Sequence, residues 1–241
     1  MIKIAEQHYI CEPVYTLAGR LVAMEVLTRF TSADGARLSY DEVSDILTPE
    51  YRWLNFVRQL HIVRQCQHWL MHHQICVSLN IDAETAEWLL RDKSVQVVLR
   101  AMPFIRLEIH EHFPSSDADR HGLLHHLRAR VPLWLDDVGS GSRSNFGLLL
   151  KGYFCAAKID RAFFWQHHAE DPVRLGKVIR DLTRYAGQVV VEGVENYGHI
   201  LSLTACPQCW LQGYHFRSVR TEHLREIPLW VTSTIMSPVS D

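Results

Sequence analysis

Residues 9–28 read YICEPVYTLAGRLVAMEVLT, and this stretch decides the predicted fold. Two apolar runs of strand length, 9–16 and 21–28, flank the short connection Leu17-Ala18-Gly19-Arg20, which favours a β-hairpin. Segments of helix length, such as 51–72 and 83–100, then alternate with further apolar runs at 75–81, 104–110, 132–137, 155–159, 188–194 and 208–214. Such alternation indicates βαβ units and a parallel sheet.

Eight predicted strands in a chain of 241 residues favour an α/β fold of the (β/α)8 TIM-like barrel type. The opening hairpin requires one strand that runs antiparallel to the others. An open doubly wound sheet is the alternative, but no G-x-G-x-x-G turn follows the first strands. We expect a single domain over residues 1–230 and a short polar C-terminal tail over 231–241.

Composition limits the classes of function. Hydrophobic residues make up 47% and charged residues 22% of the chain. The formal net charge is −2, which argues against duplex nucleic acid as a binding partner. No apolar run approaches the roughly 20 residues of a membrane helix, and MIKIAEQHYI lacks a signal-peptide core. We therefore expect a cytoplasmic protein without a membrane partner.

Cysteines are scattered through apolar segments, which predicts reduced core thiols. Cys206 and Cys209 form a C-x-x-C pair, but no second pair supplies the other ligands of a zinc site. A turn with ordinary thiols is therefore favoured over zinc.

Polar side chains stand near the carboxyl end of every predicted strand after the hairpin turn. Five are carboxylates, namely Glu25, Glu108, Asp136, Asp137 and Glu192, and the others include Asn80, Lys158 and Gln212. In a barrel these ends meet at one mouth, where barrel enzymes place their chemistry. Mg²⁺ and Mn²⁺ prefer such oxygen ligands, and two ions could share a bridging aspartate. Lys158 and Arg29 would supply positive charge for a phosphate.

These residues resemble the motifs of the EAL-domain phosphodiesterases, which hydrolyse cyclic di-GMP in bacteria. Glu25-Val26-Leu27, followed by Thr28-Arg29, is similar to the Glu-Ala-Leu motif, and Asn80 stands in VSLNI. The E-x-T-E, D-D-F-G-x-G, K-I-D, E-G-V-E and Q-G-Y motifs are similar to residues 108–111, 136–141, 158–160, 192–195 and 212–214. Order and spacing agree over about residues 9–220, so the predicted domain is identified as an EAL domain.

The resemblance implies two Mg²⁺ or Mn²⁺ ions and hydrolysis of one phosphodiester bond to give linear pGpG, and Ca²⁺ is expected to inhibit. The first ion would take Glu25, Asn80, Glu108 and Asp136, and the second would take Asp136 and Asp137 with Glu192 nearby. Lys158 would orient the attacking water, and Glu192 would act as the base or position it. Arg29 would bind a phosphate, and the other implied substrate contacts are Leu27, Asp160 and Gln212.

The resemblance also implies a mobile loop at Val138–Asn145 that couples metal and substrate binding to homodimer formation. Gly139 and Gly141 would free its backbone, and Glu111 and Glu195 would anchor it. The chain departs from the family at Val26, His110, Val138 and Ser142-Arg143, where the family has Ala, Thr, Phe and usually Tyr-Ser. Glu12-Pro13 stands where the family often has Gln-Pro, and a glutamate there could accept hydrogen bonds from a guanine.

Three functions follow from this reading. An active cyclic-guanylate-specific phosphodiesterase is favoured, because every matched metal-site position is retained. By lowering the second messenger it would affect biofilm, fimbriae or motility. The alternative is a non-catalytic EAL domain that senses cyclic di-GMP or binds a protein partner, and only the altered loop supports it. An unrelated metal hydrolase of monoesters or sugars would not explain seven motifs in order.

Overall fold

A long antiparallel hairpin opens the chain in the computed structural model, which describes residues 4–110, 113, 120–139 and 149–231. Its strands β1 (Ile4–Thr16) and β2 (Leu21–Ser32) pair from end to end. Gly19 has φ +87° in the turn, and an added Cβ would lie 2.3 Å from the carbonyl oxygen of Val231. The turn therefore needs glycine both for its conformation and for the close approach of the C-terminal segment.

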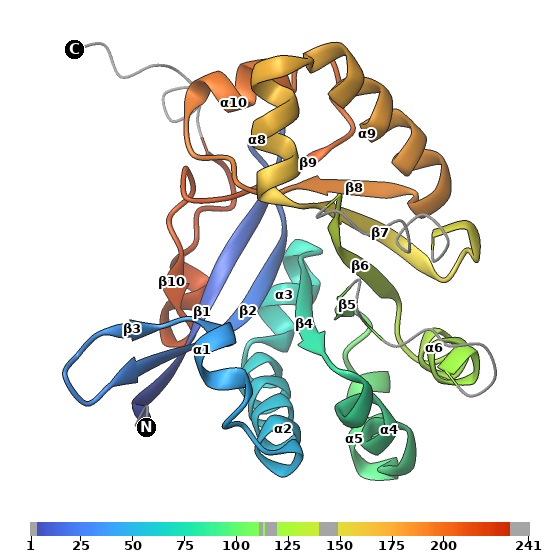
Figure 1. Cartoon of the computed structure of the whole chain (residues 1–241). Coiled ribbons are helices and arrows are strands. Elements are labelled where there is room, and N and C mark those ends of the chain that lie inside the picture. Colours follow the sequence, from blue (N-terminus) through green and yellow to red (C-terminus); the bar gives the residue numbers. More distant parts are fainter. Residues whose placement is uncertain (1–3, 111–112, 114–119, 140–148, 232–241) are drawn as a thin grey trace.

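Six parallel strands follow the hairpin, and together with β1 and β2 they close a barrel (Figure 1). They are β4 (Cys76–Ile81), β5 (Ile105–Ile109), β6 (Leu133–Val138), β7 (Phe154–Ile159), β8 (Gln188–Val191) and β9 (Trp210–Gln212). The strand order β1-β9-β8-β7-β6-β5-β4-β2 returns to β1 through the hairpin pairing. β1 runs antiparallel to both of its barrel neighbours, which confirms the predicted α/β barrel with one antiparallel strand.

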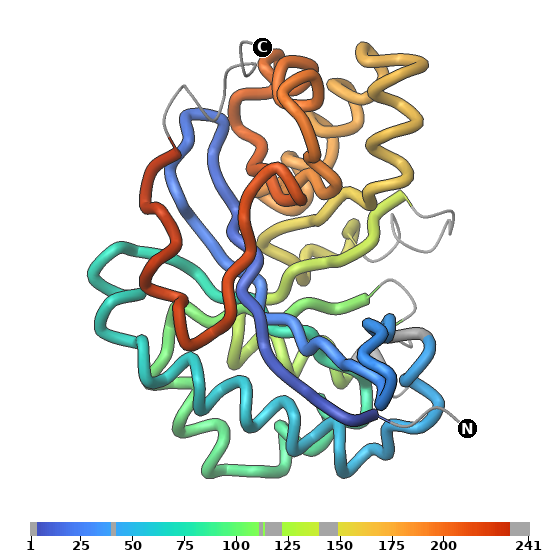
Figure 2. Tube along the Cα trace, turned by 90° about the vertical axis from the view of Figure 1, so that its left-hand side faces the viewer, coloured from blue at the N-terminus to red at the C-terminus, as the bar shows by residue number. Residues whose placement is uncertain are grey.

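Two short strands extend this sheet and were not predicted. β3 (Arg37–Leu38) pairs with the outer part of β2, and β10 (Val219–Arg220) pairs with β1. Figure 2 shows the resulting placement of the red C-terminal segment beside the blue hairpin. Two-residue strands carry no periodic signal, so only their pairing partners define them.

Helices lie around the outside of the barrel (Figure 1). Two predicted helical segments are each divided in two, at Cys66 and at Asp92. Asp92 ends one helix and caps the next, because its carboxylate accepts hydrogen bonds from the backbone N–H groups of Ser94 and Val95. The helices are α1 (Tyr40–Ser44), α2 (Pro49–Gln65), α3 (Gln67–His73), α4 (Ala83–Arg91), α5 (Lys93–Arg100), α6 (Arg120–Arg128), α8 (Arg161–Glu170), α9 (Pro172–Ala186), α10 (Tyr197–Ser202) and the 3-10 helix η1 (Thr221–Glu226).

Apolar side chains fill the space between the strands and the helices. They also fill the part of the barrel interior that lies away from the carboxyl ends of the parallel strands. The main core includes Val26, which alternates with the neighbouring Glu25 and faces the helices. A separate buried cluster contains Val14, Ala23, Trp134, Ala156 and Val190. Each of these five lies on a different barrel strand, so the cluster closes the barrel below its mouth.

The described part of the chain contains no helix that is long and apolar enough to cross a bilayer. Cys206 and Cys209 are buried free thiols. Among the described residues, neither of them belongs to a group of three or more His, Cys, Asp or Glu side chains placed to hold a metal. The predicted C-terminal tail lies outside the described residues beyond Val231.

Candidate active site

The polar layer at the barrel mouth stands directly above the apolar cluster. Side chains on one face of a strand recur every second residue, so on β2, β6, β7 and β8 the residue two positions after the cluster member also points into the barrel. Ala23, Trp134, Ala156 and Val190 are thus followed by Glu25, Asp136, Lys158 and Glu192. The change from apolar to polar within two residues places the candidate chemistry at the carboxyl ends of the strands.

Lys158 is the centre of this layer, and only 1% of its side chain is exposed. Its Nζ lies 3.0 Å from Glu25, 2.9 Å from Glu108, 3.2 Å from Asp136 and 2.7 Å from Glu192. Glu25 also accepts hydrogen bonds of 2.8 Å from Asn80 and 2.7 Å from Gln212. One ammonium group therefore organises carboxylates from four other barrel strands.

This crowding shifts the pKa values of the layer in opposite directions. Burial raises the pKa of Glu192 to about 8. The charge of Lys158 opposes this shift, whereas the charges of Asp136 and Glu25 add to it. Burial and the charge of Glu25 likewise raise the pKa of Glu108 well above its ordinary value. Burial would also raise the pKa of Glu25, but Lys158 and the hydrogen bonds from Gln212 and Asn80 outweigh it and lower that pKa.

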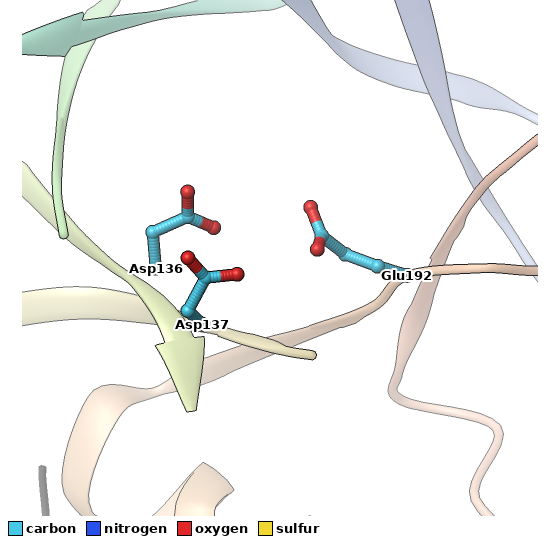
Figure 3. Close-up of side chains that lie close together, drawn as sticks. All are labelled: Asp136, Asp137 and Glu192. Carbon is cyan, nitrogen blue, oxygen red and sulfur yellow. The ribbon is translucent and has the colours of Figure 1, made fainter. Parts of the chain in front are cut away.

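Two adjacent aspartates reach the mouth because β6 is irregular at its end. Leu135 pairs with Ala157 and Val138 with Ile159, so the strand holds one residue more than its neighbour between these pairs. Asp137 takes φ +56°, a left-handed conformation uncommon for residues other than glycine. The bulge brings both carboxylates to the same side, facing Glu192 across the mouth (Figure 3).

These three acidic side chains can offer oxygens that all lie within 4.8 Å of one another. The buried Oε1 of Glu108 has no hydrogen-bond partner in the described part of the protein. Lys158 brings one positive charge to four acidic side chains, so the layer is short of positive charge, in agreement with the raised pKa values of Glu108 and Glu192. Surplus carboxylate oxygens and an unpartnered buried oxygen fit hard divalent cations such as Mg²⁺ or Mn²⁺.

A pocket of about 270 Å³ opens above this layer and gathers the residues predicted to contact substrate. Its walls include Glu12, Leu27, Arg29, Asp160 and Gln212. Arg29 lies within β2 rather than after it, and its Nη2 lies 2.7 Å from Glu12 Oε1. Burial and the nearby Glu25 raise the pKa of Glu12, whereas Arg29 opposes that shift.

Besides Gly193 and Gly213, the pocket wall contains two residues that were not predicted as site residues, Arg161 and Tyr214. Arg161 follows the K-I-D motif directly, and its guanidinium lies 5.2 Å from the ring centroid of Trp165. Tyr214 ends the Q-G-Y motif, and 73% of it is exposed at the pocket. Its position directly after the K-I-D motif could have indicated Arg161 as a site residue. The exposure of Tyr214 at the pocket depends on the fold, so no signal in the sequence indicated it.

The predicted loop anchors are only partly described. Glu195 lines the pocket, and its backbone N–H lies 3.3 Å from Nδ1 of His199. Gly139 has φ +105°, and an added Cβ would lie 2.6 Å from the ring of Phe163. Val138 is buried. Glu111, Ser140, Gly141 and Ser142-Arg143 lie outside the described residues.

The similar proteins include relatives of two different kinds. YdiV of Escherichia coli K12, a putative anti-FlhC(2)FlhD(4) factor, is 33% identical over 158 residues, which are 63% of this chain and 66% of that protein. The match thus spans just under two thirds of YdiV. The cyclic di-GMP phosphodiesterase PdeH of Escherichia coli K12 is 28% identical over 194 residues, which are 79% of this chain and 74% of PdeH.

Solved structures share the fold. The crystal structure of the EAL-like domain protein YdiV matches with a TM-score of 0.81 at 23% identity, over 94% of this chain and 97% of that one. The PaMucR phosphodiesterase in complex with c-di-GMP matches with a TM-score of 0.66 at 24% identity, over 90% of this chain and 94% of that one. A family model described as the EAL domain matches residues 6–218. The chain therefore belongs to the EAL domain family.

Proposed function

We propose that the chain is a metal-dependent phosphodiesterase that hydrolyses cyclic di-GMP to linear pGpG. The observation that carries this proposal is the convergence of Glu25, Glu108, Asp136 and Glu192 on Lys158 at the barrel mouth. A site built only to stabilise the barrel would not need four buried or half-buried carboxylates around one lysine, because burying charges is costly. The similarity to PdeH supports the same activity.

Glu25, Asn80, Glu108 and Asp136 would hold a first cation, and Asp136, Asp137 and Glu192 would hold a second. When bound, Mg²⁺ or Mn²⁺ would lower the pKa of a water molecule and stabilise charge on the phosphate oxygens. Lys158 would hold that water, because its ammonium is a fixed donor among the carboxylates. Glu192, at 2.7 Å from Lys158, would position the water or accept its proton.

The pocket would bind the dinucleotide through groups of different character. Arg29 would contact a phosphate, and Leu27 would give an apolar contact to a base or ribose. Glu12 would accept hydrogen bonds from the N1–H and N2–H₂ edge of guanine. Asp160 caps α8 through the backbone N–H of Phe163, so its carboxylate is fixed at the pocket wall together with Gln212.

A turnover assay with Glu25→Ala tests this proposal. We expect the wild type to form pGpG with Mg²⁺ or Mn²⁺, to stop when the metal is chelated, and to be inhibited by Ca²⁺. Glu25→Ala should lose turnover by at least about 10²-fold, because it removes a ligand and a partner of Lys158. Glu87→Ala is the matched control, since Glu87 pairs with Arg91 on the exposed face of α4.

A second candidate is a non-catalytic EAL domain that binds cyclic di-GMP or a protein partner. The similarity to YdiV, whose name describes an anti-FlhC(2)FlhD(4) factor, favours it. Tight binding of cyclic di-GMP without any turnover, in the presence of either metal, would select this candidate. Homodimer formation, a cytoplasmic location and an effect on biofilm, fimbriae or motility stay predictions under both functions.

A further inference from the structure

We propose that His110 is a positioning residue that holds Asp137 in the orientation needed to bind the second cation. This inference rests on the two-cation site of the proposed function. Nε2 of His110 lies 2.6 Å from Oδ2 of Asp137, and half of the His110 side chain is exposed. The E-x-T-E motif that residues 108–111 resemble has threonine at this position, where this chain has histidine.

Asp137 needs such support because of its backbone. It stands in the bulge at the end of β6 with φ +56°. A left-handed conformation is uncommon outside glycine, although aspartate tolerates it better than most residues, and it persists where the surroundings fix it. His110 follows directly after β5, which is the neighbour of β6 in the barrel. The imidazole therefore reaches Asp137 from the adjacent strand and ties the bulge to the barrel.

The chemistry of the contact defines its role. A carboxylate oxygen only accepts, so at 2.6 Å the His110 Nε2 must carry the proton and donate it. A carboxylate has two oxygens and about four acceptor sites, so one oxygen can take the imidazole N–H while the group also ligates a cation. Hydrogen bonds of this kind orient metal ligands, and their loss typically weakens metal binding by about 10–100-fold.

The opposite role predicts the opposite result. If His110 instead competed with the cation for Asp137, its removal would strengthen metal binding. The bulge favours the positioning role, because it already turns Asp137 toward Asp136 and Glu192, whose oxygens lie within 4.8 Å. His110 needs only to keep this arrangement, not to create it.

The test measures metal binding without substrate. Metal-free protein is titrated with Mn²⁺, and free Mn²⁺ is followed by electron paramagnetic resonance for the wild type, His110→Ala and His110→Gln. We expect two ions in the wild type. In His110→Ala one site should be retained and the other weakened about 10–100-fold. The amide N–H of His110→Gln can replace the imidazole donor and should recover part of the loss.

His223→Ala is the matched control, because His223 forms an exposed 2.8 Å contact with Glu226 in η1. It should bind Mn²⁺ as the wild type does. Unchanged or tighter binding of both ions by His110→Ala would overturn the inference, and so would a wild type that binds only one ion. A wild type that binds two ions, loses one in His110→Ala and yet hydrolyses nothing would support the inference and contradict the proposed function alone.

Discussion

Nζ of Lys158 lies 2.7 Å from Oε1 of Glu192, although Lys158 is on β7 and Glu192 follows the neighbouring strand β8. The pair connects the residue proposed to hold the water with the residue proposed to accept its proton. Lys158 binds three further carboxylates, so its orientation does not depend on Glu192 alone. The barrel itself therefore fixes the geometry on which the proposed chemistry depends.

Lys158→Met should destabilise the metal-free protein strongly. It removes the buried cation that four carboxylates share. Removing one partner of a buried ion pair typically costs about 3–5 kcal/mol. The unfolding free energy in chelator measures this effect. Mg²⁺ should restore part of the loss, because it supplies the missing positive charge. Lys93→Ala, on the exposed start of α5, should change little, and an equal effect of the two substitutions would contradict this role of Lys158.

The stabilisation that a divalent cation gives should grow with pH. Burial raises the pKa of Glu192 from 4.5 to about 8, and the charges of Asp136 and Glu25 add to this shift, although Lys158 lowers the pKa. Between these values the folded state binds the extra proton, so the metal-free protein loses stability as the pH rises through this window. A cation competes with that proton. The Mg²⁺-induced increase in Tm should therefore be larger at pH 8.5 than at pH 6.

Glu192→Gln serves as the control for this pH dependence. It cannot ionise, so the difference between the two pH values should shrink in this variant. An equal Mg²⁺-induced increase at both pH values in the wild type would contradict the raised pKa.

Gly213→Ala should destabilise the fold and disturb the pocket wall. Gly213 has φ +151°, and an added Cβ would lie 2.4 Å from both the backbone nitrogen and the backbone oxygen of Val194. Backbone atoms cannot move aside as a flexible side chain can, so we expect a loss of about 2 kcal/mol. Gly122→Ala in α6 has open space around it and should stabilise by about 0.5–1 kcal/mol. Denaturant unfolding of both variants measures the contrast.

Glu12→Gln should weaken recognition of guanine. Glu12 lines the pocket and lies 2.7 Å from Arg29, so it can face both the base and the phosphate-binding group. A neutral amide offers one acceptor where a carboxylate offers two, and KM for cyclic di-GMP should rise several-fold with kcat less affected. An unchanged KM would show that Glu12 does not read the guanine edge.

The barrel could be predicted because its pattern is local. The hairpin 9–28 and the alternation of strands with helices indicate both the closed sheet and its antiparallel strand. Residues at the strand ends could be named because every barrel brings those ends to one mouth. The bulge at Asp136 and Asp137 could not be predicted, since it depends on the register against β7. The His110–Asp137 contact joins the ends of two consecutive strands, and no spacing rule indicates it.

The most direct measurement of the central claim is the conversion of cyclic di-GMP by the purified chain, with Mg²⁺ or Mn²⁺ added and then chelated. The proposed function predicts linear pGpG as the product, formed only while metal is present and lost in Glu25→Ala. Wild-type protein that binds cyclic di-GMP with metal present and returns it unhydrolysed would contradict the claim.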